Sequence, residues 1–467
     1  MATITFWGGV GSVTGSKYLL EHNGRKILVD CGLFQGDKEL RERNWADPPF
    51  RAEEIDAVII THAHVDHTGW LPRLVKLGFS GEVFTSRATC DLLKILLPDS
   101  ARLQEEEADY RNRHSLTSHS PALPLYDEQD AKETLKLLHP VKNDGEFVQI
   151  CEGFGANFKV AGHILGASMV LVSIDGAKKD GSDIRFLFSG DLGHYDQPIV
   201  KDPATPPNCD YLMCESTYGN RLHGETTSDI QLADIINAAY KRNAPILIPA
   251  FAVGRTQELL YMIRELEDEK KIPSMPVVVD SPMAAQATQV YNRFSEEHDE
   301  EYASILAKKI HPLRTDWMRT ASTREESKRI NEMKGARIII SSSGMLTGGR
   351  VLHHAMRILP NENATIIFVG YQAAGTTGRR ILNGEREVRI MKNWIPVRCI
   401  VEKVEGFSAH ADWKAVIRWL SGLKQSPTTV FTTHGEPEAA EAMAGHIRDE
   451  FGWNVVAPEY GQRVELV

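Results

Sequence analysis

Three histidines and one aspartate lie within six residues in the segment "AVIITHAHVDHTG" (57–69). Imidazoles and carboxylates are the groups that hold zinc in proteins, at distances of about 2.0–2.2 Å. His62 and His64 can point the same way if the backbone is extended, while Asp66 and His67 lie on the turn that follows. The spacing therefore predicts two adjacent metal ions on a strand-to-helix loop, with one side of the site open to a substrate.

Two metal ions need more than four ligands, and polar residues at the ends of apolar segments can supply the others. His163 lies between glycine-containing turns in "AGHILGA", Asp191 ends the apolar strand in "FLFSGDLG", and His434 ends the one in "VFTTHGE". A buried, unpaired carboxylate at Asp191 would be costly, and a position between two cations removes that cost. Asp30 in "ILVDCG" has a similar placement, and we expect it to orient a ligating imidazole.

The elements that position these residues follow two different sequence patterns. The first 200 residues alternate apolar and polar residues around glycine-rich turns, which predicts a β-rich layered domain with helices outside. From about residue 222 helices and apolar strands alternate regularly, which favours a largely parallel sheet. After residue 395 short strands return with one helix, so we expect one domain to be inserted into another.

The bulk composition is that of a globular protein, with 467 residues, 42% hydrophobic and 25% charged. The six cysteines form no C-x-x-C pair, and we expect free, mostly buried thiols. A net charge of −10 argues weakly against a generally basic nucleic-acid binder, although a local basic surface can exist on an acidic protein. No apolar run approaches about 18 residues and the N-terminus lacks signal-peptide features, so we expect a cytoplasmic protein without a membrane span.

The motifs "LVDCG", "THAHVDHTG", "AGHILGA" and "FSGDLG" resemble, in order, four motifs of the metallo-β-lactamase fold. "CESTYG" (214–219), "FSAHAD" (407–412) and "TTHGE" (432–436) are similar to three further motifs of the β-CASP nucleases. The resemblance covers essentially the whole chain. It is closest to the ribonucleases related to the nuclease subunit of the cleavage and polyadenylation specificity factor, in the short bacterial-type form without the RNA-binding KH domains of archaeal relatives.

This resemblance implies an α/β protein, an αββα sandwich interrupted by a Rossmann-like β-CASP domain. The expected segments are residues 1–208 and 396–467 for the metallo-β-lactamase domain and 209–395 for the β-CASP domain. It also implies two zinc ions, one held by His62, His64 and His163, the other by Asp66, His67 and His434. Asp191 would bridge them.

Two zinc ions suit hydrolysis by a bridging hydroxide, and Asp66 is expected to take part in catalysis as well as in binding. Glu215 and His410 form an expected proton-transfer pair, in which the carboxylate orients the imidazole and His410 protonates the leaving 3′ oxygen. His410 could instead only cap the helix that follows "FSAHAD".

Contacts to the substrate are predicted from small residues and cations. Ser343 and Gly344 in "SSSGMLTGGR" have backbone N–H groups that could hold a phosphate, although a plain tight turn would use the same residues. Arg350 and Ser408 are further candidates. The segments 306–337 and 378–398 are rich in Lys and Arg, and either contact phosphates or are solvated helix faces.

The leading hypothesis is a zinc-dependent ribonuclease that cuts single-stranded RNA, because an inserted domain favours a polymeric substrate. A DNA nuclease of the Artemis-like branch is the first alternative, but that branch lacks the histidine found here at position 434. A small-molecule metallohydrolase would leave Glu215, His410 and the inserted domain without a purpose. An inactive scaffold is disfavoured because every ligand position is filled. Internal cutting, cutting from a 5′ end, and a homodimer all stay open.

Overall fold

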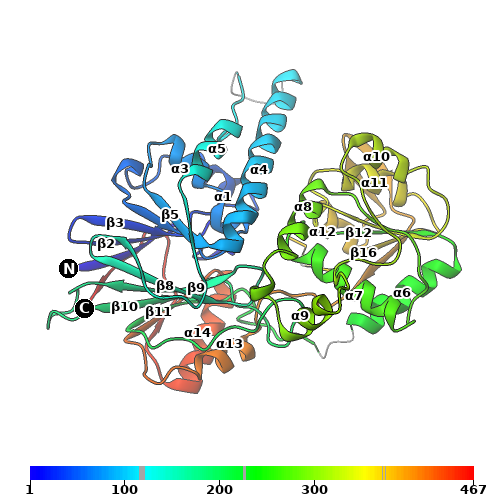
Figure 1. The fold of residues 1–467 in the computed structure, drawn as a ribbon. Helices are drawn as coiled ribbons and strands as arrows, with labels where there is room; N and C mark the ends of the chain where they lie inside the picture. The colour runs from blue at the N-terminus through cyan, green and yellow to red at the C-terminus, as the bar shows by residue number, and fades with distance from the viewer. Residues whose placement is uncertain (115–120, 225–227, 371, 374) are drawn as a thin grey trace. The chain divides into compact units, whose positions relative to one another are not determined.

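The computed structural model describes residues 1–114, 121–224, 228–370, 372–373 and 375–467 (Figure 1). The chain divides into two compact units. The first unit consists of Met1–Leu222 together with Ala409–Val467, and the second of His223–Ser408. One unit is therefore inserted into the other, as the change of sequence texture predicts.

Two seven-stranded sheets form the centre of the first unit. The strands of the first sheet, in spatial order, are β22 (Arg463–Leu466), β1 (Ala2–Phe6), β2 (Tyr18–His22), β3 (Arg25–Val29), β4 (Ala57–Ile59), β5 (Glu82–Ser86) and β6 (Leu138–Val141). Those of the second are β21 (Val455–Val456), β20 (Thr429–Thr433), β11 (Tyr211–Glu215), β10 (Ile184–Phe188), β9 (Ser168–Ile174), β8 (Phe154–Val160) and β7 (Val148–Cys151).

The two sheets bury one apolar face each against the other. Phe6 and Ile27 of the first sheet and Phe158, Phe186 and Phe431 of the second belong to one core cluster. In β1 and β3 the residues of this cluster alternate with residues of the opposite face, which is the period-2 pattern of a strand packed on one side. This core fixes the strands whose ends carry the candidate ligands.

Helices cover the outer faces of both sheets (Figure 1). The first sheet carries α3 (Leu71–Lys76), α4 (Arg87–Arg113) and α5 (Glu128–Lys136), and the second carries α13 (Trp413–Leu420) and α14 (Pro437–Phe451). Shorter elements of this unit are α1 (Lys38–Arg43), α2 (Val65–Thr68) and the 3-10 helix η1 (Ala52–Glu54). The layers are helix, sheet, sheet and helix, as expected.

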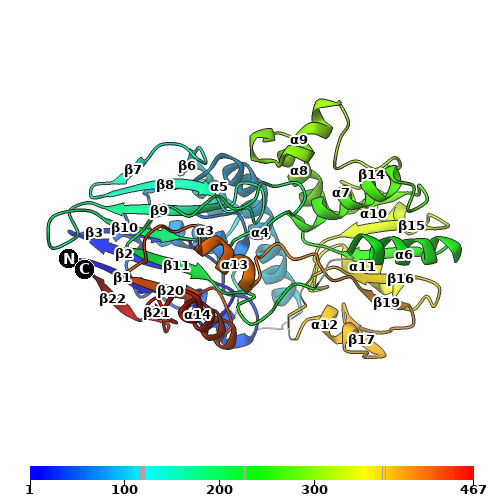
Figure 2. The same cartoon turned by 90° about the horizontal axis from the view of Figure 1, so that it is seen from below.

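The second unit contains a six-stranded sheet in which every paired strand is parallel. Its strands, in spatial order, are β14 (Met318–Thr320), β13 (Val277–Val279), β15 (Arg337–Ser341), β12 (Pro245–Pro249), β16 (Thr365–Phe368) and β19 (Ile400–Lys403). The helices are α6 (Ser228–Lys241), α7 (Arg255–Asp268), α8 (Pro282–Tyr291), η2 (Ser295–Glu297), α9 (Glu300–Ala307), α10 (Arg324–Ile330), α11 (Val351–Ile358) and α12 (Thr377–Leu382). Strands β17 (Glu387–Ile390) and β18 (Asn393–Pro396) form a separate hairpin, seen with α12 in Figure 2.

The borders of the inserted unit differ from the expected segment 209–395. Strand β11 pairs with β10 and β20 of the second sheet, so the chain up to Leu222 stays in the first unit. Strand β19 pairs with β16, which keeps the residues up to Ser408 in the second unit. Pairing between strands that are distant in sequence sets these borders, and the local composition of the chain does not reveal that pairing.

Two bulk expectations concern cysteines and membranes. All six cysteines are free thiols and five of them are buried, which confirms the expectation from their spacing. Among the described residues, no helix combines the length and the apolar character needed to cross a bilayer.

Candidate metal centre

The candidate ligands lie at the carboxyl ends of strands. His62 follows β4, His163 follows β8, Asp191 follows β10, and His434 follows β20. Within each sheet these strands run in the same direction, so their carboxyl ends meet at the same edge. The topology thus gathers residues that are far apart in sequence, such as His67 and His434, which are separated by 367 positions.

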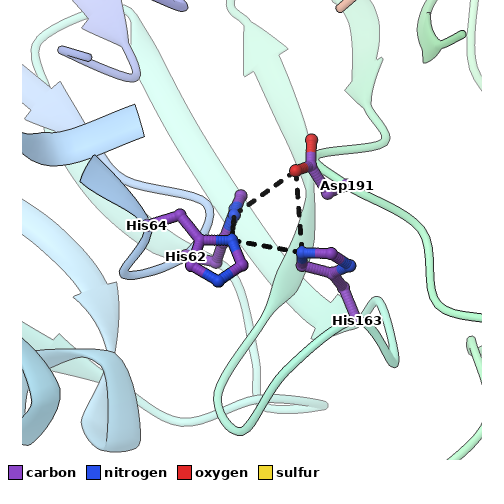
Figure 3. Close-up of side chains that lie close together, drawn as sticks. All are labelled: His62, His64, His163 and Asp191. Carbon is purple, nitrogen blue, oxygen red and sulfur yellow. Dashed lines mark hydrogen bonds and ion pairs between the residues drawn. The ribbon is translucent and has the colours of Figure 1, made fainter. Parts of the chain in front are cut away.

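One group of donors consists of His62, His64, His163 and Asp191 (Figure 3). His64 Nδ1 lies 3.1 Å from His62 Nε2 and 3.2 Å from His163 Nε2. Asp191 Oδ2 lies 3.5 Å from His62 Nε2 and 3.7 Å from His163 Nε2. His64 has an extended backbone immediately before α2, which is the conformation that the H-x-H spacing requires.

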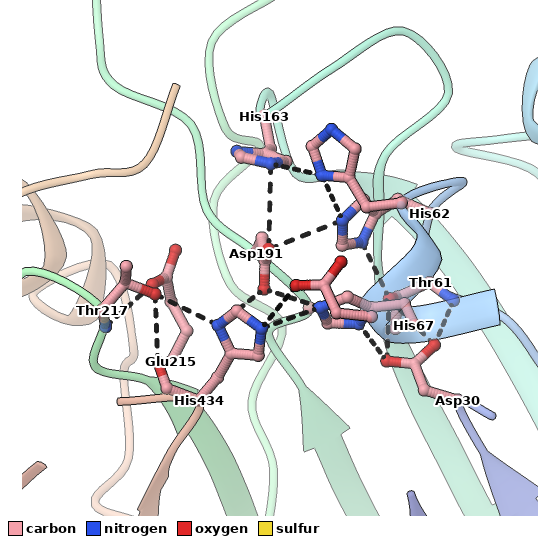
Figure 4. A network of polar contacts seen from close by, with 12 residues as sticks. Asp30, Thr61, His62, His67, His163, Asp191, Glu215, Thr217 and His434 are labelled. Carbon is pink, nitrogen blue, oxygen red and sulfur yellow. Dashed lines mark hydrogen bonds and ion pairs between the residues drawn. The ribbon is translucent and has the colours of Figure 1, made fainter. Parts of the chain in front are cut away.

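The second group consists of Asp66, His67 and His434. Figure 4 shows His67 and His434 within the surrounding network of polar contacts. His67 Nε2 and His434 Nε2 are 3.0 Å apart, and Asp66 Oδ2 lies 3.5 Å from His434 Nε2. Asp191 Oδ1 lies 3.3 Å from His67 Nε2 and 3.4 Å from His434 Nδ1. The two oxygens of Asp191 therefore face the two groups, one oxygen to each.

The chemistry of the donors fits divalent cations. Asp191 Oδ1 is buried and accepts no hydrogen bond from the described residues. Burial holds the pKa of His62 and of His163 well below the usual range and lowers the pKa of His64 to about 4, so these imidazoles are neutral at pH 7, as metal ligands must be. Neutral ring nitrogens at such short separations, beside a carboxylate, suit a zinc-type cation.

Neighbouring groups hold the ligands in position. Asp30 Oδ2 lies 2.7 Å from His67 Nδ1, and Asp30 also accepts hydrogen bonds from the backbone N–H and the hydroxyl of Thr61. His163 directs Nδ1 to the carbonyl of Ala409 at 3.1 Å, which leaves Nε2 for the donor group. The position of Asp30 is the one expected for a residue that orients a ligating imidazole.

Glu215 and His410 lie beside Asp191. His410 Nδ1 is 3.1 Å from Glu215 Oε1 and 3.9 Å from Asp191 Oδ2. The Leu192 N–H donates to Glu215 Oε1 at 2.8 Å and the Thr217 N–H donates to Oε2 at 3.2 Å, so both carboxylate oxygens are fixed. Burial lowers the pKa of His410, but the carboxylates of Glu215 and Asp191 outweigh it and raise the pKa to about 9. His410 therefore carries a proton at neutral pH in this arrangement.

The predicted substrate residues lie mainly in the second unit. Ser343 and Gly344 belong to the loop between β15 and α11, and Ser408 is the last residue of this unit. Ser343 Oγ accepts a hydrogen bond from the Thr347 N–H at 3.1 Å. Arg350 donates to Asp280 Oδ1 at 2.8 Å, and to the carbonyls of Ala321 at 2.9 Å and Ser322 at 3.0 Å. Arg350 thus fastens its loop to two neighbouring segments.

Two residues near the centre were not predicted from sequence. Thr217 Oγ1 donates to the His434 carbonyl at 3.0 Å and lies 3.1 Å from His434 Nδ1. Its position in "CESTYG", two residues after Glu215, was the available signal.

The other residue is Lys17, which is buried and follows Ser16, whose backbone N–H donates to the Asp66 carbonyl. Its ammonium donates to the Gly32 carbonyl and lies 4.6 Å from the Phe34 ring centre and 5.2 Å from that of Trp70. Burial lowers the pKa of Lys17 to about 8. A lysine inside the apolar strand pattern "KYLL" was the signal, but its partners are not visible in sequence.

Comparison with known families matches three parts of the chain. Residues 11–82 match the metallo-beta-lactamase superfamily, residues 256–381 the Beta-Casp domain, and residues 394–458 the Zn-dependent metallo-hydrolase RNA specificity domain. A solved structure of a protein of unknown function from Enterococcus faecalis has a TM-score of 0.54 and 13% identity, covering 100% of both chains. At this identity the likeness supports the fold alone.

Two curated relatives extend the comparison to the whole chain. A protein named Ribonuclease TTHA0252, from Thermus thermophilus, is 33% identical over 461 residues, which are 98% of this chain and 99% of that protein. A protein named Transcription termination factor FttA, from Methanocaldococcus jannaschii, is 29% identical over 467 residues, which are 97% of this chain and 70% of that protein. Because the similarity to the Thermus protein spans both chains and the three family segments occur in the expected order, the chain belongs to the β-CASP ribonuclease family of metal-dependent hydrolases with the metallo-β-lactamase fold.

Proposed function

We propose that this protein hydrolyses phosphodiester bonds of single-stranded RNA at the centre around Asp191. The observation that carries the proposal is the arrangement of donors on both sides of that carboxylate, with the Glu215–His410 pair beside it. The name of the Thermus relative supports RNA as the substrate class. The presence of His434 favours RNA over DNA, because the Artemis-like branch of DNA nucleases lacks a histidine at this position.

The proposed cofactor is a pair of zinc ions. His62, His64 and His163 would hold one ion, Asp66, His67 and His434 the other, and Asp191 would contact both. When bound, such ions would lower the pKa of water and offset the negative charge that develops on a phosphate.

The proton transfers belong to the chain's own side chains. The leaving 3′ oxygen needs a proton, and protonated His410 is the donor that we propose. Glu215 lies 3.1 Å from Nδ1 of this ring and so fixes the orientation of the imidazole. The half-buried Asp66, with a side chain that is 21% exposed, is the second catalytic candidate.

The loop after β15 is the proposed phosphate contact. No acceptor within the described residues pairs with the backbone N–H groups of Gly344, Met345, Gly348 and Gly349. Such a run of N–H groups can bind an anion. We propose that Ser343 and Gly344 contact a phosphate directly, that Arg350 holds the loop in shape through Asp280, and that Ser408 contacts substrate near His410 in the chain.

A substrate comparison tests this function. Purified protein with zinc should degrade single-stranded RNA, whereas single-stranded DNA of the same sequence and a β-lactam should be cleaved far more slowly. RNA carrying a labelled 5′ monophosphate or 5′ triphosphate separates the two modes of cutting. Mononucleotides from the monophosphate alone indicate a 5′ exonuclease, and internal fragments from both indicate an endonuclease. Lactam hydrolysis without RNA cleavage would contradict the proposal.

A further inference from the structure

The β17–β18 hairpin of the second unit has one buried and one exposed face. Val388, Ile390 and Ile395 belong to the apolar core cluster of this unit. Arg389 and Trp394 are directly opposite each other in the strand register, and the alternating burial of the two strands puts both on the exposed face. The buried face and the neighbouring helix α12 therefore fix the backbone that presents Arg389 and Trp394 to solvent.

Trp394 is 58% exposed and Met391, in the turn of the hairpin, is 51% exposed. Single exposed apolar residues are common and need no explanation. Here, however, an indole faces an arginine across a rigid pair of strands, at a cross-strand distance that brings long side chains into reach of each other. This is a flat aromatic surface with a cation beside it.

The segment that contains this hairpin is positively charged in an otherwise acidic chain. Residues 386–398 contain four cations against one acid, Glu387, which gives +3, whereas the whole chain carries −10. The cations are Arg386, Arg389, Lys392 and Arg398, all exposed. The nearby Arg380 pairs with Glu385, so this acid is already neutralised.

An aromatic ring with flanking cations is the combination that binds single-stranded nucleic acid, because a base stacks on the ring and the cations contact phosphates. Met391 and Trp394 are the large exposed apolar side chains that the described residues place on this hairpin, which is little for a stable protein interface. We propose that the outer face of β17–β18 is an accessory surface for single-stranded RNA, with a base stacked on Trp394 and phosphates contacted by Arg389, Arg386 and Arg398. The choice of RNA rests on the proposed function.

Binding of a fluorescein-labelled 30-nucleotide single-stranded RNA tests this surface. The full chain carrying zinc and His410→Ala, so that the RNA is not consumed, is compared with the same chain carrying Trp394→Ala. We expect Trp394→Ala to weaken binding about tenfold, the size of one lost base–aromatic stack, and Trp394→Phe to restore most of it. Arg389→Gln should reduce the slope of log affinity against log salt by about one.

Trp317 provides the matched control because it is 62% exposed, in the same unit and also in a basic segment. Trp317→Ala should bind RNA like the parent. Equal weakening by Trp317→Ala and Trp394→Ala would overturn the assignment to the hairpin. Unchanged RNA affinity of Trp394→Ala would also overturn it, and a changed oligomeric state in that variant would assign the face to a protein contact instead.

Failure of this inference is distinguishable from failure of the proposed function. If the unmodified chain cleaves RNA and Trp394→Ala binds RNA normally, the accessory surface is wrong and the proposed function stands. If the unmodified chain neither binds nor cleaves RNA, the proposed function itself is wrong. Equal urea midpoints for parent and variants would exclude unfolding as the cause of any loss.

Discussion

At the scale of single residues, Asp191 lies between the two groups of candidate metal ligands. Its side chain is 1% exposed, and the five histidines around it lie within 4 Å of its oxygens. Burial alone would raise the pKa of Asp191, yet the neighbouring imidazoles of His434 and His67 hold it well below the usual range, so the group stays ionised. An ionised carboxylate in this position needs cations around it.

Removing this carboxylate should remove metal. In Asp191→Ala we expect zinc per chain to fall below that of the parent, for which we propose two ions, because each proposed site loses a ligand. Metal content by atomic emission after gel filtration measures this directly. Asp180→Ala, in an exposed turn, is the control and should keep the parent zinc content. A full zinc complement in Asp191→Ala would contradict the bridging position.

The pairing of Glu215 with His410 gives a pH-dependent prediction. If His410 donates a proton, the rate should fall as pH rises through its pKa, which Glu215 and Asp191 raise to about 9 against the effect of burial. Glu215→Gln removes one of the raising charges, so the alkaline fall in kcat should move to lower pH, by roughly 1–3 units.

The pH profile of kcat with zinc at saturation measures this shift. A merely structural role for Glu215 would lower the rate equally at every pH. An alkaline limb at the same pH in Glu215→Gln and in the parent would contradict the proposed pairing.

At the scale of elements, the loops at the carboxyl ends of strands position the candidate ligands. The loop with Cys31 and Gly32 packs so closely on the ligand loop that a Cβ at Gly32 would lie 1.6 Å from the Asp66 carbonyl. The Cys31 N–H donates to the His67 carbonyl at 2.7 Å, and the Ser16 N–H to that of Asp66 at 2.9 Å. Backbone contacts therefore fix the ligand loop, and glycine at position 32 is required by space.

The second unit has a comparable buried connection at the end of β13. Asp280 accepts hydrogen bonds from Arg350 at 2.8 Å and from Ser327 at 2.5 Å, and lies 2.6 Å from His354 Nε2. Burial raises the pKa of Asp280, but these hydrogen bonds outweigh it and lower the pKa below its ordinary value. Because the folded pKa is depressed, the stabilisation is present above the ordinary pKa of about 4 and is lost as pH falls through the folded pKa.

Asp280→Asn should therefore destabilise the protein by about 2–3 kcal/mol at pH 7, the scale of hydrogen bonds to a charged group. The difference from the parent should shrink as pH falls below about 4. Urea unfolding at several pH values measures both effects. Asp316→Asn, an exposed change in the same unit, serves as the control. A difference that is independent of pH would contradict the ionised state of Asp280.

The candidate site was largely predictable from sequence because its ligands carry rare residue types in short motifs. His62, His64, Asp66 and His67 are close together in sequence, and the strand-to-helix loop places them in the two candidate donor groups. The partners of Arg350 and Lys17 were not predictable, because these contacts join segments that only the folded chain brings together. For the same reason the borders of the inserted unit differ from the segment expected from sequence, because the pairing of β11 and β19 decides them.

At the scale of the whole molecule, the proposed zinc ligands and most of the proposed RNA contacts lie in different units. The first unit contains every proposed zinc ligand and the Glu215–His410 pair, and the second contains the loop after β15 and the basic hairpin. An acidic chain that binds RNA must do so through local positive surfaces, because its net charge of −10 repels phosphate. We therefore expect RNA affinity to decrease steeply with salt concentration.

The most direct test of the account combines cleavage and metal content in one variant, His410→Ala. We predict that it keeps two zinc ions per chain and loses RNA cleavage by about 10²–10⁴-fold, the usual contribution of a general acid. His139→Ala changes a half-buried histidine of strand β6, outside both candidate donor groups, and should keep both metal and activity. Undiminished RNA cleavage by His410→Ala with both zinc ions bound would contradict the account.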